Sequence, residues 1–342
     1  MINTFFKELI SQNCRVDTVD LDKLDKYVDL FNRASKKMVG ESEFTVEEYR
    51  VEYETPGFDP ESATRVVFSP EGIPIGLVEV WDLDEIPVHP FIWARVDPEW
   101  EGHGIGTAMM QWGFERAREA LTRVPQELRV SAFASVQGNY EPAMQLLSNL
   151  HMQPVRHFWR MAIDLKEAPP APEWPDGVML RSFDPEADLE AVFRAEDEAF
   201  QDHWGYVEQP FKKKFPEWKH LTISKPNFDP GLWFLAMDGA EIAGLARCVA
   251  STTQDPDMGW VQVLGVRRPW RRKGLGLALL RHSFRTFHQI GKARGGLGVD
   301  ASNLTGATRL YQDAGMYITR ANTSFEYQLR PGEELMTEEA RV

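Results

Sequence analysis

The stretch VLGVRRPWRRKGLGLALL, residues 263–280, places a β-branched run before a basic cluster, a Gly-x-Gly turn and a helical pattern. A turn of this kind leaves backbone N–H groups free at the start of a helix, and its glycines let a ligand approach the backbone closely. The helix dipole and the free donors favour an anion there. Basic side chains beside the turn add charge-assisted bonds to phosphate oxygens, and the predicted diphosphate cradle reads Arg271, Arg272, Lys273, Gly274, Leu275 and Gly276.

Other glycine-rich nucleotide motifs fit this turn less well. A Walker loop requires Lys-Ser or Lys-Thr after its last glycine, whereas Leu277 and Ala278 follow Gly276. The dinucleotide fingerprint requires a third glycine near the position of Leu279, and an acidic residue about twenty residues further on, where the chain reads KARGGLG. A structural alternative stays open, in which the glycines only turn a strand into a helix and the basic run is a solvated face.

A second stretch, ARVDPEWEGHGIGTAMM at residues 94–110, repeats the same skeleton 170 residues earlier. The matched pairs are Val96 with Val266, Trp100 with Trp270, Gly104 with Gly274, and Gly106 with Gly276. Hairpin-like segments upstream and NYEPAMQLLSNLHM against NLTGATRLYQDAGM downstream follow in matching order. The proline-rich linker KEAPPAPEWPDG, residues 166–177, lies between the copies. The sequence therefore predicts two domains of one fold, residues 1–165 and 178–342.

Each half shows the same coarse order of elements: a helical segment, a hairpin, a strand, the glycine turn, a helix, a strand and a last helix. Strands that first pair as a meander and are then joined through helices form a mixed sheet with helices on its faces. The predicted fold class is α/β (α+β), with two mixed central sheets that are each flanked by helices.

Composition limits the partners. The formal net charge of −14 argues against nucleic acid or an anionic membrane, and it would attract a cationic substrate. The two cysteines, Cys14 and Cys248, give no disulfide framework, which favours a reducing cytoplasm. The N-terminus does not resemble a secretory signal, and no apolar run reaches membrane-spanning length. The histidines show no metal-ligand spacing, so no metal is expected; an oligomeric state is not indicated.

The last helical segment carries a second candidate site. Asn303, Ala307 and Tyr311 are spaced i, i+4 and i+8, so they lie on one helix face, and Gly315 is placed to end the helix. A polar group, a small residue and a phenol form an unusual core stripe, which favours a face that a ligand approaches. The structural alternative is that Tyr311 is a half-buried aromatic residue.

These motifs together resemble the GCN5-related N-acetyltransferase (GNAT) superfamily. The matching residues are the run VLGV, then Arg271, Gly274 and Gly276 of the glycine turn, and a late pattern formed by Asn303, Ala307, Leu310, Tyr311, Gly315 and Met316. The resemblance implies that acetyl-CoA lies between splayed strands. Its pantetheine would pair with the backbone of Leu264, Gly265 and Val266, and its pyrophosphate would sit on residues 271–276. Asn303 and Ala307 would lie by the cofactor.

The implied reaction is acetyl transfer to a small primary amine, cationic in bulk water, by direct aminolysis of the thioester. The N–H of Val266 would stabilise the oxyanion, and Tyr311 would protonate the departing thiolate. The base stays open between Asp257, Glu198, Asp202, His203 and water, the last three side chains lying in or beside the acidic stretch EDEAFQDHWG. A non-catalytic acyl-CoA-binding sensor or scaffold is the alternative function.

The tandem arrangement, with the phrases PNFDPGLWFLAMDG and EAFQDHWG, also resembles the mycothiol synthase family, itself a duplicated acetyltransferase. Trp260 stands where that family carries a catalytic glutamate, so the acceptor does not follow from the resemblance. In the N-terminal copy, Glu101 replaces Arg271 and Leu147 replaces Tyr311. We therefore expect a degenerate N-terminal domain and a catalytic C-terminal domain.

Overall fold

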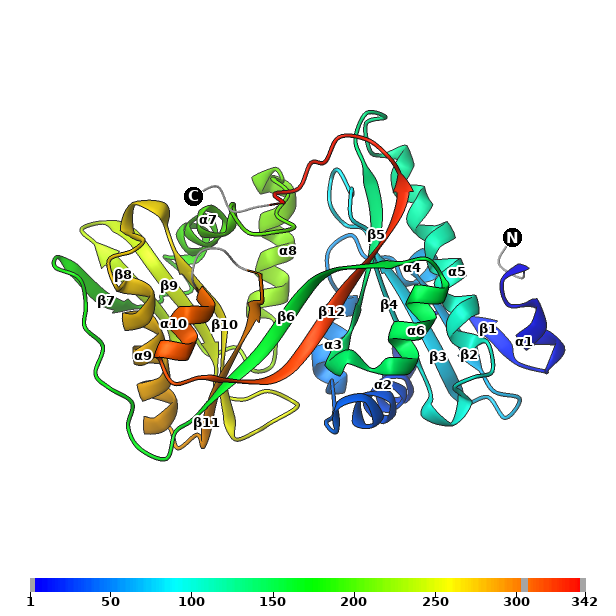
Figure 1. Ribbon diagram of the computed structural model, residues 1–342, viewed down its shortest axis with the longest axis horizontal. Coiled ribbons are helices and arrows are strands. Elements are labelled where there is room, and N and C mark those ends of the chain that lie inside the picture. The colour runs from blue at the N-terminus through cyan, green and yellow to red at the C-terminus, as the bar shows by residue number, and fades with distance from the viewer. Residues whose placement is uncertain (1–3, 303–306, 339–342) are drawn as a thin grey trace. The chain divides into compact units, whose positions relative to one another are not determined.

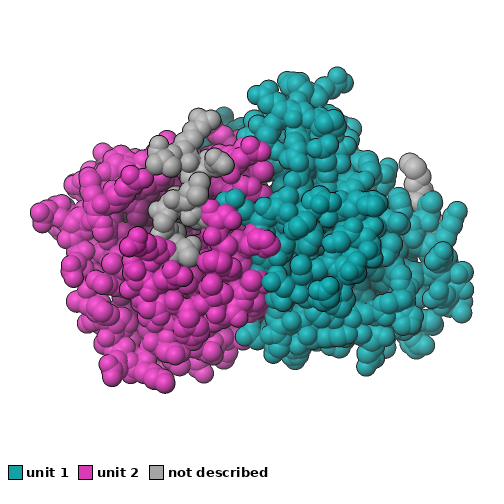
Figure 2. Space-filling view, in the orientation of Figure 1, with its two compact units in different colours: residues 1–156, 209–221, 322–335 teal, residues 157–208, 222–321, 336–342 magenta. Residues whose placement is uncertain are grey.

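The chain forms two compact units in the computed structural model, which describes residues 4–302 and 307–338 (Figure 2). Unit 1 comprises Met1–Arg156, Gln209–Leu221 and Asn322–Leu335, and unit 2 comprises His157–Glu208, Thr222–Ala321 and Met336–Val342. Each unit therefore contains segments from both halves of the chain, which the predicted division at residues 166–177 does not provide for.

Unit 1 is built on a mixed sheet with the strand order β1-β2-β3-β4-β5-β12. The strands are β1 (Arg15–Asp17), β2 (Thr64–Phe68), β3 (Pro74–Trp81), β4 (Phe91–Val96), β5 (Val130–Val136) and β12 (Tyr317–Arg330). The helices are α1 (Lys7–Ser11), α2 (Leu24–Val39), α3 (Val46–Tyr53), α4 (Pro60–Ala63), α5 (Ile105–Ala117) and α6 (Glu141–Asn149), with α8 (Phe211–Ile223) contributed mainly to this unit. Short 3₁₀ turns are η2 (Leu21–Lys23), η3 (Pro98–Trp100), η4 (Arg118–Thr122) and η5 (Gln137–Asn139).

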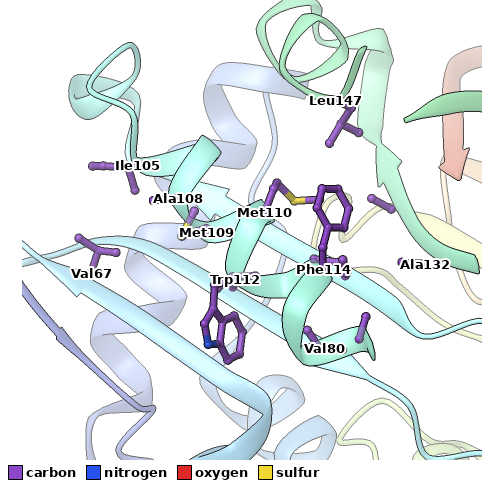
Figure 3. Close-up of a cluster of buried hydrophobic side chains, with 14 of the residues drawn as sticks. Val67, Val80, Ile105, Ala108, Met109, Met110, Trp112, Phe114, Ala132 and Leu147 are labelled. Atoms are coloured by element: carbon purple, nitrogen blue, oxygen red, sulfur yellow. The ribbon is translucent and has the colours of Figure 1, made fainter. Parts of the chain in front are cut away.

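Helices cover both faces of the unit 1 sheet (Figure 1). Helix α5 packs against β3 and β4, and its buried side chains Met109, Met110 and Trp112 belong to one hydrophobic cluster (Figure 3). Helix α2 packs against the same two strands and contributes Phe31 and Tyr27 to a separate cluster. Two separate apolar clusters, each under its own helix, are what a sheet covered on both faces requires.

Unit 2 has the strand order β6-β11-β10-β9-β8-β7. The strands are β6 (Gln153–Asp164), β7 (Val178–Ser182), β8 (Trp233–Asp238), β9 (Glu241–Val249), β10 (Met258–Val266) and β11 (Arg294–Asp300). The helices are α7 (Leu189–Phe200), α9 (Leu275–Gln289) and α10 (Ala307–Asp313), with 3₁₀ turns η6 (Pro230–Leu232) and η7 (Arg268–Trp270). Helix α9 buries Leu279, Leu280 and Phe284 against β9 and β10.

The mixed α/β class is confirmed, but the strands follow one order of twelve and do not form the two separate sheets that the sequence predicts. The cause is an exchange of two long strands. Residues 323–330 of β12, from the second half of the chain, pair with β5 of the first half. Residues 158–164 of β6, from the first half, pair with β11 of the second half. Each half therefore completes the sheet of the other.

Candidate acetyltransferase site

The parallel pair β10–β11 opens within unit 2. The two strands pair from Met258↔Arg294 to Val261↔Leu297, and their register stops there although β10 continues to Val266. On its other side β10 stays paired with β9 up to Val266↔Gly244, with a register shift between Val261 and Val263. Within the described residues, the segment from Val263 to Val266 therefore has no strand partner on its β11 side. Leu264, Gly265 and Val266 lie on this open edge, where backbone groups can bond a ligand.

The glycine turn follows this open edge directly. Gly274 has φ +84° and caps α9, which begins at Leu275 and continues through Gly276. A Cβ built on Gly274 would meet no atom of the described residues within 4 Å, so these residues leave space for a ligand in front of the turn. Arg272 and Lys273 are exposed, and Arg272 has φ 62°, an unusual conformation for a residue other than glycine. The turn thus combines a free helix N-terminus with two exposed cations, which fits a diphosphate.

Arg271 takes a different role from its two neighbours. Its guanidinium donates to Val266 O at 3.0 Å, to Asp202 Oδ2 at 2.6 Å and to Ala199 O at 3.0 Å. These bonds tie the C-terminal end of α7 to the end of β10. Arg271 is therefore a brace that holds the turn in place, and the exposed charges for an anion are those of Arg272 and Lys273.

Asp202 is the acceptor of this brace and is fully committed to it. The carboxylate also pairs with Arg268, and the two guanidinium groups, Arg268 first, lower its pKa to about 2 against burial. Its side chain is 2% exposed. A carboxylate with so low a pKa is a poor proton acceptor near neutral pH, so the structure does not favour Asp202 as the base.

The other predicted bases differ in position. Asp257 precedes the first residue of β10 and lies nine residues before Val266, roughly 30 Å along an extended strand. Glu198 is ion-paired with Arg267 at 2.8 Å. His203 follows α7, with its ring centroid 4.3 Å from that of Phe200. Burial, with a smaller effect of Arg271, lowers the pKa of His203, so this imidazole is neutral and able to accept a proton near pH 7.

The carboxylates of the acidic stretch EDEAFQDHWG are occupied by internal contacts. Each of its carboxylates has a partner: Glu196 with Arg247 at 2.6 Å, Asp197 with the Tyr206 hydroxyl at 3.0 Å, Glu198 with Arg267, and Asp202 with Arg268. The segment therefore stabilises the end of α7. It offers no separate set of carboxylates to a positively charged acceptor.

Tyr311 lies on α10 and is 8% exposed. It belongs to the hydrophobic cluster that contains Leu275 and Leu297, and burial raises its pKa to about 12. Its helix adjoins the glycine turn, because a Cβ on Gly276 would lie 3.4 Å from Leu310. Of its two predicted companions, Ala307 begins α10, and Asn303 lies outside the described residues.

Trp260 lies on β10, at the position where the resemblance to the mycothiol synthase family would place a glutamate. The Arg160 guanidinium lies 4.3 Å from the ring centre of Trp260, and the ring packs on Gly296 so closely that a Cβ there would come within 2.7 Å of it. Arg160 comes from β6, in the first half of the chain, so no local pattern could have linked it to this site. The ion pairs of Arg267 with Glu198 and of Arg268 with Asp202 were not predicted either, because the partners are 69 and 66 residues apart in the sequence.

Comparison with known proteins agrees with this geometry. The model of the Acetyltransferase (GNAT) family matches residues 25–139 and 189–316, one match in each half. The chain belongs to the GNAT family. It is similar to the mycothiol acetyltransferases of Catenulispora acidiphila, with 29% identity over 271 residues (76% of this chain, 79% of the relative), and of Streptomyces scabiei, with 30% over 242 residues (68% and 70%).

Solved GNAT structures share the tandem architecture. A GCN5-related N-acetyltransferase from Sphaerobacter thermophilus matches with a TM-score of 0.75 and 29% identity, covering 94% of this chain and 98% of that one. A tandem GNAT protein from the clavulanic acid biosynthesis pathway matches with a TM-score of 0.68 and 15% identity, covering 94% and 100%, which supports the fold alone. The tandem GNAT prediction is thus confirmed and the chain is an N-acetyltransferase, so the non-catalytic alternative is not supported.

The N-terminal GNAT copy has the same two backbone features, a pair of diverging parallel strands and a glycine turn at the start of a helix. β4 and β5 pair only at Phe91↔Phe133 among the described residues, and Gly104 caps α5 with φ +81°. A cavity of about 520 Å³ lies within this copy, lined by residues of β4, the glycine turn, α5, β5 and α6. Leu147, the counterpart of Tyr311, is buried in the core beside it.

No helix in the described residues is both long and apolar enough to cross a membrane. No group of three or more histidine, cysteine, aspartate or glutamate residues in the described ranges could hold a metal ion.

Proposed function

We propose that unit 2 transfers the acetyl group of acetyl-CoA to the primary amine of a small molecule. The observation that carries this proposal is the divergence of β10 from β11 directly before the glycine turn. It gives an extended ligand an open strand edge that leads to a helix N-terminus with two exposed cations. The mycothiol acetyltransferases to which the chain is similar support a small-molecule acceptor.

The cofactor would be held mainly by backbone. Leu264, Gly265 and Val266 would pair with the pantetheine, and the N–H groups at the start of α9 would bind the pyrophosphate. Arg272 and Lys273 would add charge, whereas Arg271 keeps the turn and α7 together. Asn303 and Ala307, by resemblance, would border the cofactor.

In the transfer step the neutral amine attacks the thioester carbonyl, a C–N bond forms and the C–S bond breaks. The N–H of Val266 would stabilise the charge that develops on the carbonyl oxygen. Tyr311 would give its proton to the departing sulfur, and a pKa of about 12 keeps this phenol protonated across the physiological range. The amine's proton would pass to His203 or to water. The net charge of −14 favours an acceptor that is cationic in bulk water.

Thiol release from acetyl-CoA, measured with a panel of amines, alcohols and thiols, tests this proposal. We expect release with primary amines, at a rate that rises with pH as the amine loses its proton. A panel in which only hydroxyl or thiol acceptors react would contradict the amine acceptor. Unaltered turnover in a Gly274→Val variant would contradict the placement of the cofactor on this turn.

A further inference from the structure

The segment that follows β12, residues 331–338, is first held in unit 1. A Cβ built on Gly332 would overlap the carbonyl oxygen of Glu127, so only glycine fits this close approach. Glu333 then pairs with the backbone before β5: its N–H donates to Glu127 O at 2.8 Å, and its carbonyl accepts from Arg129 N at 2.8 Å. The segment is therefore a built part of the fold up to this residue.

Thr337 continues this segment in unit 2 and bonds to the loop that follows α7. Its N–H donates to Tyr206 O at 2.9 Å, and its carbonyl accepts from Gly205 N at 3.0 Å. Its hydroxyl donates to Gln201 O at 3.1 Å. One residue therefore joins both ends of the loop 201–206, and all of these residues belong to unit 2.

The loop 201–206 carries two side chains that are held in different ways. Asp202 is 2% exposed and is fixed by ion pairs with two arginines. His203 is half-buried, and within the described residues its ring nitrogens make no hydrogen bond. Its ring packs against that of Phe200, with the centroids 4.3 Å apart. The position of this imidazole therefore depends on the backbone of the loop.

The hydroxyl of Thr337 also completes the C-terminal end of α7. The last carbonyls of a helix have no partner within it and need donors from elsewhere. Phe200 O accepts from His203 N at 2.9 Å, and Gln201 O, at the cap, accepts from the Thr337 hydroxyl. Without this hydroxyl, the first end of the loop would lose its bond to the segment after β12, and the loop could shift relative to α7.

Four influences set the charge state of the His203 imidazole. Burial is the largest and lowers its pKa below 6.5, and Arg271 lowers the pKa further. Asp300 and Asp202 raise the pKa, by less than burial lowers it. Because burial dominates, a loop that moves into solvent should bring the pKa of His203 back toward its usual value.

We propose that Thr337 is a positioning residue for the transfer reaction: by closing the loop 201–206, it holds the His203 imidazole where that ring accepts the proton of the amine. The proposal rests on the proposed function, and on His203 rather than water as the acceptor of that proton. The glycine turn is held separately, because the ion pairs of Asp202 do not involve Thr337. Thr337 should therefore affect the transfer step and leave acetyl-CoA binding almost unchanged.

Steady-state kinetics of three variants test the role of the hydroxyl. Thr337→Val removes the hydroxyl at nearly constant volume, and Thr337→Ser keeps it. Thr286→Val is the matched control, since the half-buried Thr286 donates to His282 O at 3.0 Å in α9 of the same unit. We expect Thr337→Val to lower kcat about three- to fivefold, with the KM for acetyl-CoA within about twofold, and the other two variants to stay near the wild type. An equal fall in Thr286→Val would contradict a specific role of Thr337.

A double-substitution experiment separates positioning from a merely structural role. In the His203→Gln background, Thr337→Val should lower turnover by less than about 1.5-fold, because the group that Thr337 positions is gone. An equal fall in both backgrounds would show that Thr337 acts independently of His203 and would overturn the proposal.

NMR titration of the imidazole gives a readout that needs no turnover. The resonance of His203 is identified by its absence from the spectrum of His203→Gln. In Thr337→Val the titration midpoint of His203 should rise toward 6.5, by about 0.3 pH or more, and in Thr286→Val it should stay where it is in the wild type. An unchanged midpoint in Thr337→Val would mean that the hydroxyl does not hold the loop, against the proposal.

The failure of this proposal is distinguishable from the failure of the proposed function. No thiol release by the unaltered chain with any amine would contradict the proposed function, whatever the titration of His203 shows. Transfer by the unaltered chain, with equal losses in the two backgrounds or an unchanged midpoint, would leave the proposed function intact and remove the role of Thr337.

Discussion

The two glycine turns share a backbone and differ in charge. Gly274 and Gly104 have nearly the same conformation, φ 84°, ψ −7° and φ 81°, ψ −4°. Each turn is also braced by an ion pair to a segment before the hairpin, Arg271–Asp202 at 2.6 Å in unit 2 and Lys37–Glu101 at 2.7 Å in unit 1. Arg271 and Glu101, at matched positions, thus each anchor their turn through an ion pair, although their charges are opposite.

A second pair of matched residues repeats this reversal. Glu79 on β3 and Arg247 on β9 follow the corresponding Gly-Leu pairs of the two hairpins. Glu79 is buried and accepts from the hydroxyls of Tyr49 and Tyr53, whereas Arg247 pairs with Glu196 on α7. The duplicated fold therefore fixes the position of a polar contact but not the charge of the residue that makes it. A charge at one matched position says little about ligand binding until its partner is known.

The largest effect should come from the turn of unit 2. Gly274→Val places a branched side chain at φ +84°, where only glycine is unstrained, and should weaken acetyl-CoA binding by about 10²-fold or more. Gly72→Val is a matched control: Gly72 has φ +81°, no described atom lies within 4 Å of its Cβ position, and it lies in a hairpin turn. Titration calorimetry of acetyl-CoA binding to both variants distinguishes loss of the diphosphate site from a general effect of backbone strain. Equal losses in both would contradict a specific role for Gly274.

The next effect concerns Tyr311, whose counterpart in unit 1 is Leu147. Tyr311→Phe should lower turnover by about 10²-fold, in the range of general acid catalysis, with little change in cofactor affinity. Its packing is retained because the ring stays in the hydrophobic cluster, so the melting temperature should hardly move. Steady-state kinetics under rate-limiting chemistry provide the measurement. Near-normal turnover would assign Tyr311 to packing alone.

The two braces should differ in strength because they differ in burial. The side chain of Asp202 is 2% exposed and that of Glu101 is 29% exposed. Asp202→Asn should lower the free energy of unfolding by about 2 kcal/mol, and Glu101→Gln by about 0.5 kcal/mol, in urea titrations at neutral pH. Similar losses in the two variants would mean that burial does not distinguish the braces.

The Asp202 brace also predicts a pH dependence. The pKa of its carboxyl falls from 3.8 to about 2 on folding, so folding favours the ionised form. The stabilisation is therefore fully present above about pH 4 and is lost as the pH falls through 2. The difference in unfolding free energy between the wild type and Asp202→Asn should be constant above about pH 5 and shrink below about pH 4. A difference that grows on acidification would contradict the assigned sign.

Local features of this chain could be predicted from its sequence, and long-range ones could not. The two glycine turns follow from patterns within about twenty residues, and the mixed α/β class follows from the order of elements within each half. The partner of Arg271, Asp202, is 69 residues away, and that of Glu101, Lys37, is 64 residues away. Neither pairing leaves a periodic signal. The exchange of β6 and β12 was missed for the same reason, since a strand pattern does not say which sheet the strand joins.

The smallest effect should distinguish His203 from water as the proton acceptor. His203 follows Asp202, the carboxylate that pairs with Arg271, and burial lowers the pKa of its imidazole below the usual 6.5. Because its pKa is lowered, the His203 imidazole is neutral near pH 7. It can therefore accept the amine's proton without first losing one. His203→Gln keeps a polar side chain of similar reach and should lower turnover about tenfold, below the usual range for a general base because water can replace it in part. In the wild type, turnover should rise with pH in two steps, one as His203 loses its proton and one as the amine does. The variant should show only the step due to the amine. If turnover stays within about twofold and the pH profile is unchanged, the proton passes to water. The difference between the two copies then reduces to the charge of the glycine turn and the phenol of Tyr311.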